Sequence, residues 1–226
     1  MPNKLSEIKL VIFDVNQTMF SLKEIENSFK IYGLSRRFVD QWFLSVLKEG
    51  FSYTLSGKFI DFKTIGQNEL QKIFLQKNII CKRTSINRIL NSFSHLKIHN
   101  DVKKSLKLLK KNNLKIITLT NGSKSNTQIL LKNNKIENFI DRCFSIDQFK
   151  KWKPHKNVYL STCELMNIDP KNTLMIAAHG WDINGAKLAG LKTAYITRYE
   201  KKLSNFYLKP DYVGKDSFEI ANKLFV

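Results

Sequence analysis

Five polar residues stand where this 226-residue sequence changes from one kind of structure to the next. Asp14 directly follows an apolar run, and Thr120 and Asn121 end another. Lys153 precedes a stretch with helical periodicity, and Asp182 begins a second such stretch. A carboxylate nucleophile needs a cation that keeps it ionised, donors that orient the substrate and a polar group that positions water. These residue types supply that set and predict covalent chemistry at Asp14.

Each of these residues also has an ordinary structural interpretation. Asp14 could cap a turn through its side chain, and Thr120 with Asn121 could form a turn before Gly122. Asp182 suits a helix start, where a carboxylate favours the helix dipole, and Lys153 resembles any surface lysine. Their joint order along the chain, rather than any single residue, favours the catalytic interpretation.

Strands that alternate with helices must bring these residues together. Buried strands are predicted by apolar runs at 9–14, 114–120, 173–178 and 192–196, and helices by periodic stretches at 101–112, 155–166 and 182–189. This alternation predicts an α/β fold, a doubly wound parallel sheet with a Rossmann-like core. In such folds the carboxyl ends of the strands meet at one edge, where ligands bind.

The stretch from 21 to 97 has a different pattern, with helical periodicity and no buried strand, as between Phe38 and Leu47. We expect it to be a helical cap domain inserted after the first strand, above the strand ends. The α/β core domain would then comprise residues 1–20 and 98–226.

The composition is strongly basic, with 38 Lys and Arg against 19 Asp and Glu, a formal net charge of +19. Such a charge raises nucleic-acid binding as an alternative, because Lys and Arg neutralise phosphates. The lysines are scattered in ones and twos, as in Lys103 and Lys104, without a long basic block. We therefore expect a small-molecule substrate and no specific nucleic-acid partner.

Location follows from what the apolar runs and cysteines allow. The longest apolar runs are far shorter than the ~18 residues of a membrane span, so no membrane association is expected. The first seven residues lack the apolar stretch of a secretory signal, which predicts a cytoplasmic protein. Cys81, Cys143 and Cys163 are odd in number and widely spaced, which predicts reduced thiols rather than disulfides or a zinc site.

Four segments resemble, in order and spacing, the four motifs of the haloacid dehalogenase superfamily. They are FDVNQT at 13–18, LTNGS at 119–123, KPHKNVY at 153–159 and AHGWDINGA at 178–186. The chain is most similar to the type II (S)-2-haloacid dehalogenases. The likeness covers nearly the whole sequence, with 21–97 in the place of that family's cap.

The resemblance implies a role for each matching residue. Asp14 would displace halide from C2 of the substrate and form an ester, which water hydrolyses to a 2-hydroxy acid. Thr18 would support the loop after Asp14, Lys153 would pair with Asp14, and Asp182 would lie near the hydrolytic water. Substrate-binding roles are implied for Asn16, Trp42, Phe43, Thr120, Asn121, Tyr159 and His179.

Two departures from related patterns affect the predicted activity. Superfamily phosphatases have a second aspartate where this chain has Asn16, and an amide cannot act as a general acid or base. Those enzymes also hold magnesium with paired acidic residues, whereas the segment 178–182 contains only Asp182. We therefore predict a hydrolase that needs no metal and no cofactor.

In the cap, Phe43 aligns with an arginine that dehalogenases use to contact the halide or the substrate carboxylate, and Arg36 and Arg37 lie nearby.

The predicted function is metal-independent dehalogenation of a short 2-haloacid. A phosphatase-like hydrolase of another small organic acid or phosphate ester is the first alternative. A non-catalytic nucleic-acid-binding or regulatory protein is the second, since fold does not fix function. The sequence leaves a homodimer open.

Overall fold

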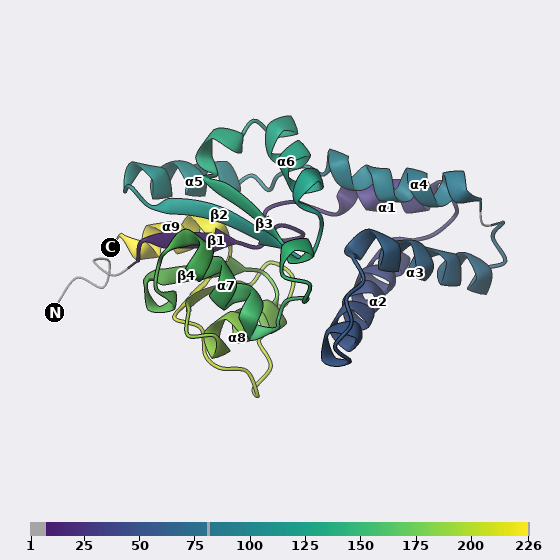
Figure 1. The fold of residues 1–226 in the computed structure, drawn as a ribbon. Helices are drawn as coiled ribbons and strands as arrows, with labels where there is room; N and C mark the ends of the chain where they lie inside the picture. The colour runs from purple at the N-terminus through teal and green to yellow at the C-terminus, as the bar shows by residue number, and fades with distance from the viewer. Residues whose placement is uncertain (1–7, 81, 226) are drawn as a thin grey trace.

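The computed structural model describes residues 8–80 and 82–225 (Figure 1). A six-stranded parallel sheet forms the core, with strand order β3-β2-β1-β4-β5-β6. The strands are β1 Leu10–Phe13, β2 Lys115–Thr120, β3 Arg142–Ser145, β4 Thr173–Ala177, β5 Lys192–Ile196 and β6 Tyr212–Gly214. The predicted α/β fold with a parallel sheet is confirmed.

The central strand β1 is the point where the strand order reverses. Val11 of β1 pairs with Ile116 of β2 on one side and with Leu174 of β4 on the other. Every residue of β1 and β4 is buried, which explains their continuous apolar sequences, because helices cover both faces of a parallel sheet. Ligands bind at such a reversal, outside the carboxyl ends of the strands. Asp14, the residue after β1, lies at that place.

Helices pack on both faces of the sheet. Figure 1 shows α5 Val102–Lys111 and α6 Lys124–Asn133 on one side, and α7 Lys156–Met166 and α8 Gly180–Leu188 on the other. The last helix, α9 Ser217–Leu224, packs against α5. Helix α5 buries Val102, Leu106 and Leu109 and exposes four of its five lysines, as its apolar spacing requires.

Four further helices lie beyond the strand ends, apart from the sheet (Figure 1). They are α1 Lys23–Lys30, α2 Arg36–Leu55, α3 Phe62–Gln76 and α4 Arg83–Asn91. Their shared core is aromatic: the fully buried Trp42 ring lies 5.5–6.1 Å from the rings of Phe29, Phe62 and Phe93. A helical segment after β1 is therefore present, while its limits at 21 and 97 stay a prediction.

Two strands were not predicted from the sequence. β3 begins with the exposed Arg142, and β6 contains Val213, which is 46% exposed. Both are edge strands, so neither has the continuous apolar sequence of a central strand. Short edge strands of this kind give almost no periodic signal.

Other sequence predictions concern the cysteines and the membrane. Cys143 and Cys163 are free thiols, and Cys81 lies outside the described residues. Among the helices of residues 8–80 and 82–225, none is long and apolar enough to cross a membrane.

Candidate active site

The carboxylate of Asp14 is held by the end of the neighbouring strand β4. The Thr18 hydroxyl donates to Asp14 Oδ2 over 2.6 Å and accepts from the backbone N–H of Ala178 over 3.0 Å. The backbone N–H of Asp14 donates to the Ile176 carbonyl over 3.1 Å. These bonds fix the loop after β1, so the nucleophile candidate has one defined orientation.

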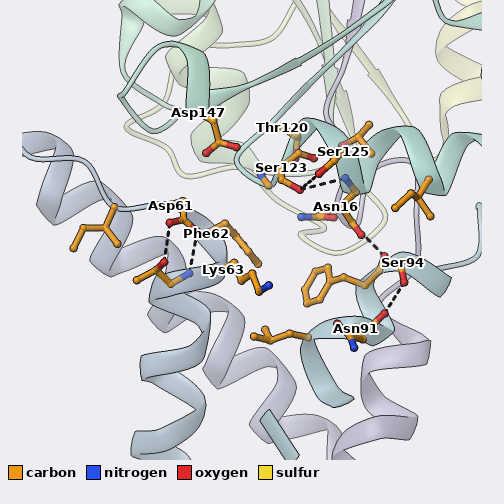
Figure 2. Close-up of a pocket in the computed structure, with 18 of the residues that line it drawn as sticks. Asn16, Asp61, Phe62, Lys63, Asn91, Ser94, Thr120, Ser123, Ser125 and Asp147 are labelled. Atoms are coloured by element: carbon orange, nitrogen blue, oxygen red, sulfur yellow. Dashed lines mark hydrogen bonds between the residues drawn. The ribbon is translucent and has the colours of Figure 1, made fainter. Parts of the chain in front are cut away.

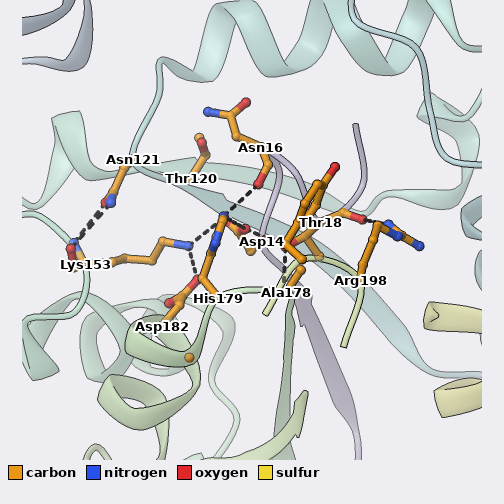
Figure 3. Close-up of polar contacts among 12 residues, drawn as sticks. Asp14, Asn16, Thr18, Thr120, Asn121, Lys153, Ala178, His179, Asp182 and Arg198 are labelled. Atoms are coloured by element: carbon orange, nitrogen blue, oxygen red, sulfur yellow. Dashed lines mark hydrogen bonds and ion pairs between the residues drawn. The ribbon is translucent and has the colours of Figure 1, made fainter. Parts of the chain in front are cut away.

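The ammonium of Lys153 joins two carboxylates that are remote in sequence (Figure 3). It donates to Asp14 Oδ1 over 2.9 Å, to Asp182 Oδ2 over 2.6 Å and to the Leu119 carbonyl over 2.9 Å. An ammonium has three N–H donors, so all of them are used. The side chain is fully buried, which removes the screening that weakens a surface ion pair.

These contacts set the protonation states of the cluster. Burial raises the pKa of Asp14, but the Lys153 charge, His179 and the Thr18 hydroxyl outweigh it, and the pKa falls below its ordinary value. Burial lowers the pKa of Lys153, and the charges of Asp14 and Asp182 more than reverse that effect. Asp14 is therefore held as a carboxylate beside a protonated lysine, as a nucleophile requires.

Asp182 is surrounded more completely than Asp14. The Tyr159 hydroxyl donates to Asp182 Oδ1 over 2.5 Å while Lys153 occupies Oδ2, so both oxygens are engaged. Burial and the charge of Asp14 raise the pKa of Asp182, against the opposing charge of Lys153. Burial and Asp182 also raise the pKa of Tyr159 well above its ordinary value, so the phenol remains a donor.

Tight packing of α8 brings Asp182 to the lysine. Gly185 lies one turn after Asp182, and a Cβ there would meet Pro154 Cβ at 2.5 Å. Only glycine allows the helix to approach the Lys153–Pro154 segment this closely. The structure places Asp182 in the first turn of α8, two residues after the helix begins at Gly180.

Asn121 contacts the backbone of Lys153 rather than open space. The Lys153 N–H donates to Asn121 Oδ1 over 2.9 Å, and Asn121 Nδ2 donates to the Lys153 carbonyl over 3.4 Å. Both ends of the amide therefore position the lysine. The neighbouring Thr120 accepts from the Gly122 N–H over 2.9 Å and lines the cavity described below.

His179 lies near Asp14 and two aromatic rings. Its Nε2 is 3.3 Å from the Asn16 carbonyl and 3.9 Å from Asp14 Oδ2. The imidazole stacks on Trp181 at 5.4 Å between ring centroids and has the Phe43 ring at 6.1 Å. Phe43, from the helical segment, thus reaches the wall of the site.

Like Asn121, the predicted substrate contacts Trp42 and Tyr159 bond to other protein groups and do not line the cavity. The Trp42 indole donates to the Gly66 carbonyl over 2.9 Å, and its ring is enclosed within the core of the helical segment. Tyr159 is fully buried behind Asp182. Trp42 is not available to a substrate because its ring lies on the apolar face of α2, which packs against α3.

Sequence reasoning missed two residues that support the site. The Trp152 indole donates to the Ile60 carbonyl over 3.0 Å, and its backbone N–H donates to Thr54 Oγ1 over 2.9 Å, which ties the residue before Lys153 to the helical segment. Arg198 donates to the Thr18 carbonyl over 2.7 Å while paired with Asp101 at 2.6 Å. Neither stands in a recognisable motif, so no local signal could have identified it.

A cavity of about 960 Å³ lies between the sheet edge and the helical segment (Figure 2). Asn16 and Thr120 line it on the core side, and Phe62 and Lys63 on the side of α3. Asp14 is only 4% exposed and lies behind Asn16, outside the lining. Asn16, two residues after Asp14 in the chain, and Thr120, the last residue of β2, form the part of the lining at the sheet edge.

The parallel sheet and the buried carboxylate–ammonium–carboxylate cluster at its reversal define an α/β protein with a charged site at the strand ends. The family model of haloacid dehalogenase-like hydrolases matches residues 11–196 of the chain. The chain belongs to this family and is a hydrolase. The resemblance inferred from the four motifs is confirmed.

Individual relatives agree with this family. The chain is 25% identical over 200 residues to (S)-2-haloacid dehalogenase 1 of Pseudomonas sp. (strain CBS-3), which covers 87% of this chain and 88% of the relative. It is 24% identical over 210 residues to haloacetate dehalogenase H-2 of Moraxella sp. (strain B), covering 92% and 94%. The solved structure of L-2-haloacid dehalogenase from Xanthobacter autotrophicus has the same fold, with a TM-score of 0.88, 20% identity and coverage of 95% and 97%.

Proposed function

We propose that the protein is a hydrolytic 2-haloacid dehalogenase in which Asp14 is the covalent nucleophile. The observation that carries this proposal is the position of the Asp14 carboxylate. Lys153 binds one of its oxygens, Thr18 binds the other, and the pKa lies below the ordinary value. The relatives named as 2-haloacid and haloacetate dehalogenases support the reaction type.

The reaction proceeds in two displacements. An oxygen of Asp14 attacks C2 of the substrate opposite the carbon–halogen bond, the bond breaks, and halide leaves with its electron pair. Water then attacks the Asp14 carboxyl carbon, the ester bond breaks, and the 2-hydroxy acid departs. Of the two protons of the attacking water, one ends on the C2 oxygen of the departing 2-hydroxy acid and the other is released, so each turnover frees one proton together with the halide.

We propose that this hydrolase works without a divalent metal. Asn16 offers an amide in place of a second carboxylate, and both oxygens of Asp182 are already bonded to Lys153 and Tyr159. The Lys153 ammonium supplies the positive charge between Asp14 and Asp182. Hard cations such as Mg²⁺ require several free oxygen ligands, which this arrangement does not offer.

Halide release from 2-chloropropionate, measured with and without excess EDTA, tests the proposal. We expect wild-type turnover that survives the chelator, and turnover that is almost abolished in Asp14→Asn, because the near-isosteric amide is a poor nucleophile. The variant should keep the wild-type circular dichroism spectrum. Magnesium-dependent phosphate release from p-nitrophenyl phosphate, with no halide release, would contradict the proposal and assign the protein to the phosphatases.

A further inference from the structure

The cavity in front of Asp14 is far larger than a short haloacid requires. Its volume of about 960 Å³ lies near the top of the roughly 300–1,000 Å³ that pockets for drug-sized ligands span. Chloropropionate, with about six heavy atoms, would fill a small part of that space and leave most of its wall uncovered. The geometry therefore suits a longer substrate, an inference that rests on the proposed function.

Asp61 and Lys63, two charged residues of the cavity lining, differ in whether other protein groups bind them. Asp61 is the N-cap of α3 and accepts from the Thr64 N–H over 3.0 Å and from the Thr64 hydroxyl over 2.7 Å. Figure 2 shows Lys63 extending from the first turn of α3 into the space that Asn16 also faces. Within residues 8–80 and 82–225, no ion pair or hydrogen bond engages the Lys63 ammonium. It is therefore a cation available to a ligand.

Two other charged groups complete the lining. The Lys150 ammonium lies 4.9 Å from the centroid of the Phe59 ring, on the core side of the cavity. Asp147 also lines the cavity, and Figure 2 shows it well apart from Lys63. The four charged groups of the lining, two carboxylates and two ammonium groups, sum to zero. Because no carboxylate of the described residues engages the Lys63 ammonium, it is the place in the cavity where an anionic group of a ligand would bind.

The wall that leads toward Lys63 combines apolar rings with neutral polar groups. Phe62 and Phe93 line the cavity from the helical segment, with their ring centroids 5.5 Å apart. Asn16, Thr120 and Ser123 line it from the core. Methylene groups can pack on the rings, while the amide and hydroxyl groups can donate hydrogen bonds to the carboxylate at the end near Asp14.

We infer that the substrate is an extended acid with a second carboxylate distal to the reacting carbon, and that Lys63 binds this distal group. Phe43 of α2, which faces His179, carries no charge, whereas Lys63 of α3 supplies a cation to the cavity. Lys63 contacts the end of the ligand remote from the reacting bond. It therefore determines specificity and takes no part in the bond changes at Asp14.

Binding of adipate and hexanoate, measured by calorimetry, tests the distal site without any reaction. Both acids have the same chain length, and only adipate carries the second carboxylate. We expect wild type to bind adipate more tightly than hexanoate, and Lys63→Gln to lose about tenfold in adipate affinity with hexanoate affinity unchanged. Lys63→Arg should retain most of the preference because it keeps the charge.

The matched control is Lys107→Gln, which removes one exposed positive charge from α5, away from the cavity lining. It should leave both affinities at the wild-type values. Equal losses in Lys63→Gln and Lys107→Gln, or equal binding of adipate and hexanoate to wild type, would overturn the inference. Equal losses would assign adipate binding to the general field of the +19 protein. Equal binding of the two acids would show that the second carboxylate adds no affinity.

Halide release from 2-bromoadipate and 2-bromohexanoate separates this inference from the proposed function. We expect a higher kcat/KM for the dicarboxylate, and loss of that advantage in Lys63→Gln. Lys63-dependent adipate binding without halide release from any bromoacid would refute the dehalogenase proposal and retain the distal anion site. Efficient release from both bromoacids with no dependence on Lys63 would retain the dehalogenase and refute the distal site.

Discussion

Lys153 donates a 2.9 Å hydrogen bond to Asp14 although the two residues are 139 positions apart in the chain. The same ammonium lies 2.6 Å from Asp182, so one buried cation is shared by two buried carboxylates, and the excess negative charge agrees with the raised pKa of Asp182. Burying an isolated charge is costly unless it is paired and hydrogen-bonded, and this cluster satisfies both conditions. Its members therefore depend on one another for both charge state and position.

Removal of this cation should cost both activity and stability. Lys153→Met leaves Asp14 and Asp182 buried without their shared counterion, and breaking a buried pair typically costs about 3–5 kcal/mol. We expect almost no halide release and a large decrease in the free energy of unfolding. Lys156→Met, on the exposed start of α7, is the control and should change neither by much. Equal effects of the two substitutions would show that Lys153 acts only through the general positive field of the protein and has no specific role at Asp14.

The helical segment should contribute through a ring rather than through an arginine. Phe43 is 5% exposed and faces His179, so Phe43→Ala should reduce kcat/KM for small haloacids on the order of tenfold to a hundredfold through lost positioning. Arg37→Ala removes an exposed side chain and should have little effect. Steady-state halide release by both variants checks this. An inert Phe43→Ala beside an inactive, folded Arg37→Ala would return the role to an arginine.

Docking of the helical segment depends on a close contact between Gly50 and Trp152. A Cβ at Gly50 would lie 2.3 Å from Trp152 Cδ2, closer than two non-bonded carbon atoms can approach, so the ring or the helix would have to move. Glycine to alanine within a helix normally stabilises by about 1 kcal/mol, so any loss in Gly50→Ala comes from this contact. We expect a net loss of about 1–3 kcal/mol by urea denaturation, with reduced turnover.

Ser52→Ala is the control for that substitution, because Ser52 is exposed on the same helix α2. It should leave stability and turnover near the wild-type values. A more stable Gly50→Ala variant with unchanged turnover would show that the helical segment does not need the Trp152 contact.

Stability should fall at mildly acidic pH because of His99. Burial, with the charge of Arg198, lowers the pKa of His99 from 6.5 to about 4. Between these values the unfolded chain takes up a proton at His99 and the folded chain does not, so its contribution is complete above pH 6.5 and is lost as pH falls to about 4. Because the side chain is partly exposed, we expect only about 1–2 kcal/mol.

Urea denaturation of wild type and His99→Asn at several pH values measures this contribution. The variant should lose less stability on acidification than wild type over the same range. Identical pH profiles for the two proteins would assign the acid sensitivity to other groups.

The catalytic candidates could be predicted from sequence because each stands beside an element with a clear pattern. Asp14 follows a fully apolar strand, and Asp182 follows another strand closely enough to reach the same sheet edge. The carboxyl ends of parallel strands meet at one edge of the sheet, so the order of the strands along the chain was enough to predict that Asp14 and Asp182 lie close together. The edge strands β3 and β6 could not be predicted, because their short, partly exposed sequences lack that pattern.

The interior of the site could not be derived in the same way. Trp42 and Phe43 are adjacent in one helix, and sequence alone does not tell which ring turns toward Asp14. Arg198 reaches Thr18 across 180 positions, and Trp152 reaches Thr54 across 98. Such contacts depend on how the helical segment and the core pack together. The cavity volume depends on the same packing, which no local pattern encodes.

A single-turnover reaction in heavy-oxygen water tests most directly whether Asp14 is the covalent nucleophile. Enzyme in excess over 2-chloropropionate is digested after one turnover, and the peptide that contains Asp14 is weighed by mass spectrometry. Because water attacks the carboxyl carbon of the ester, we predict that heavy oxygen enters the Asp14 side chain and that the first 2-hydroxy acid formed carries none. Heavy oxygen in the product, with an unlabelled Asp14 peptide, would show that water attacks the substrate directly and would contradict the account.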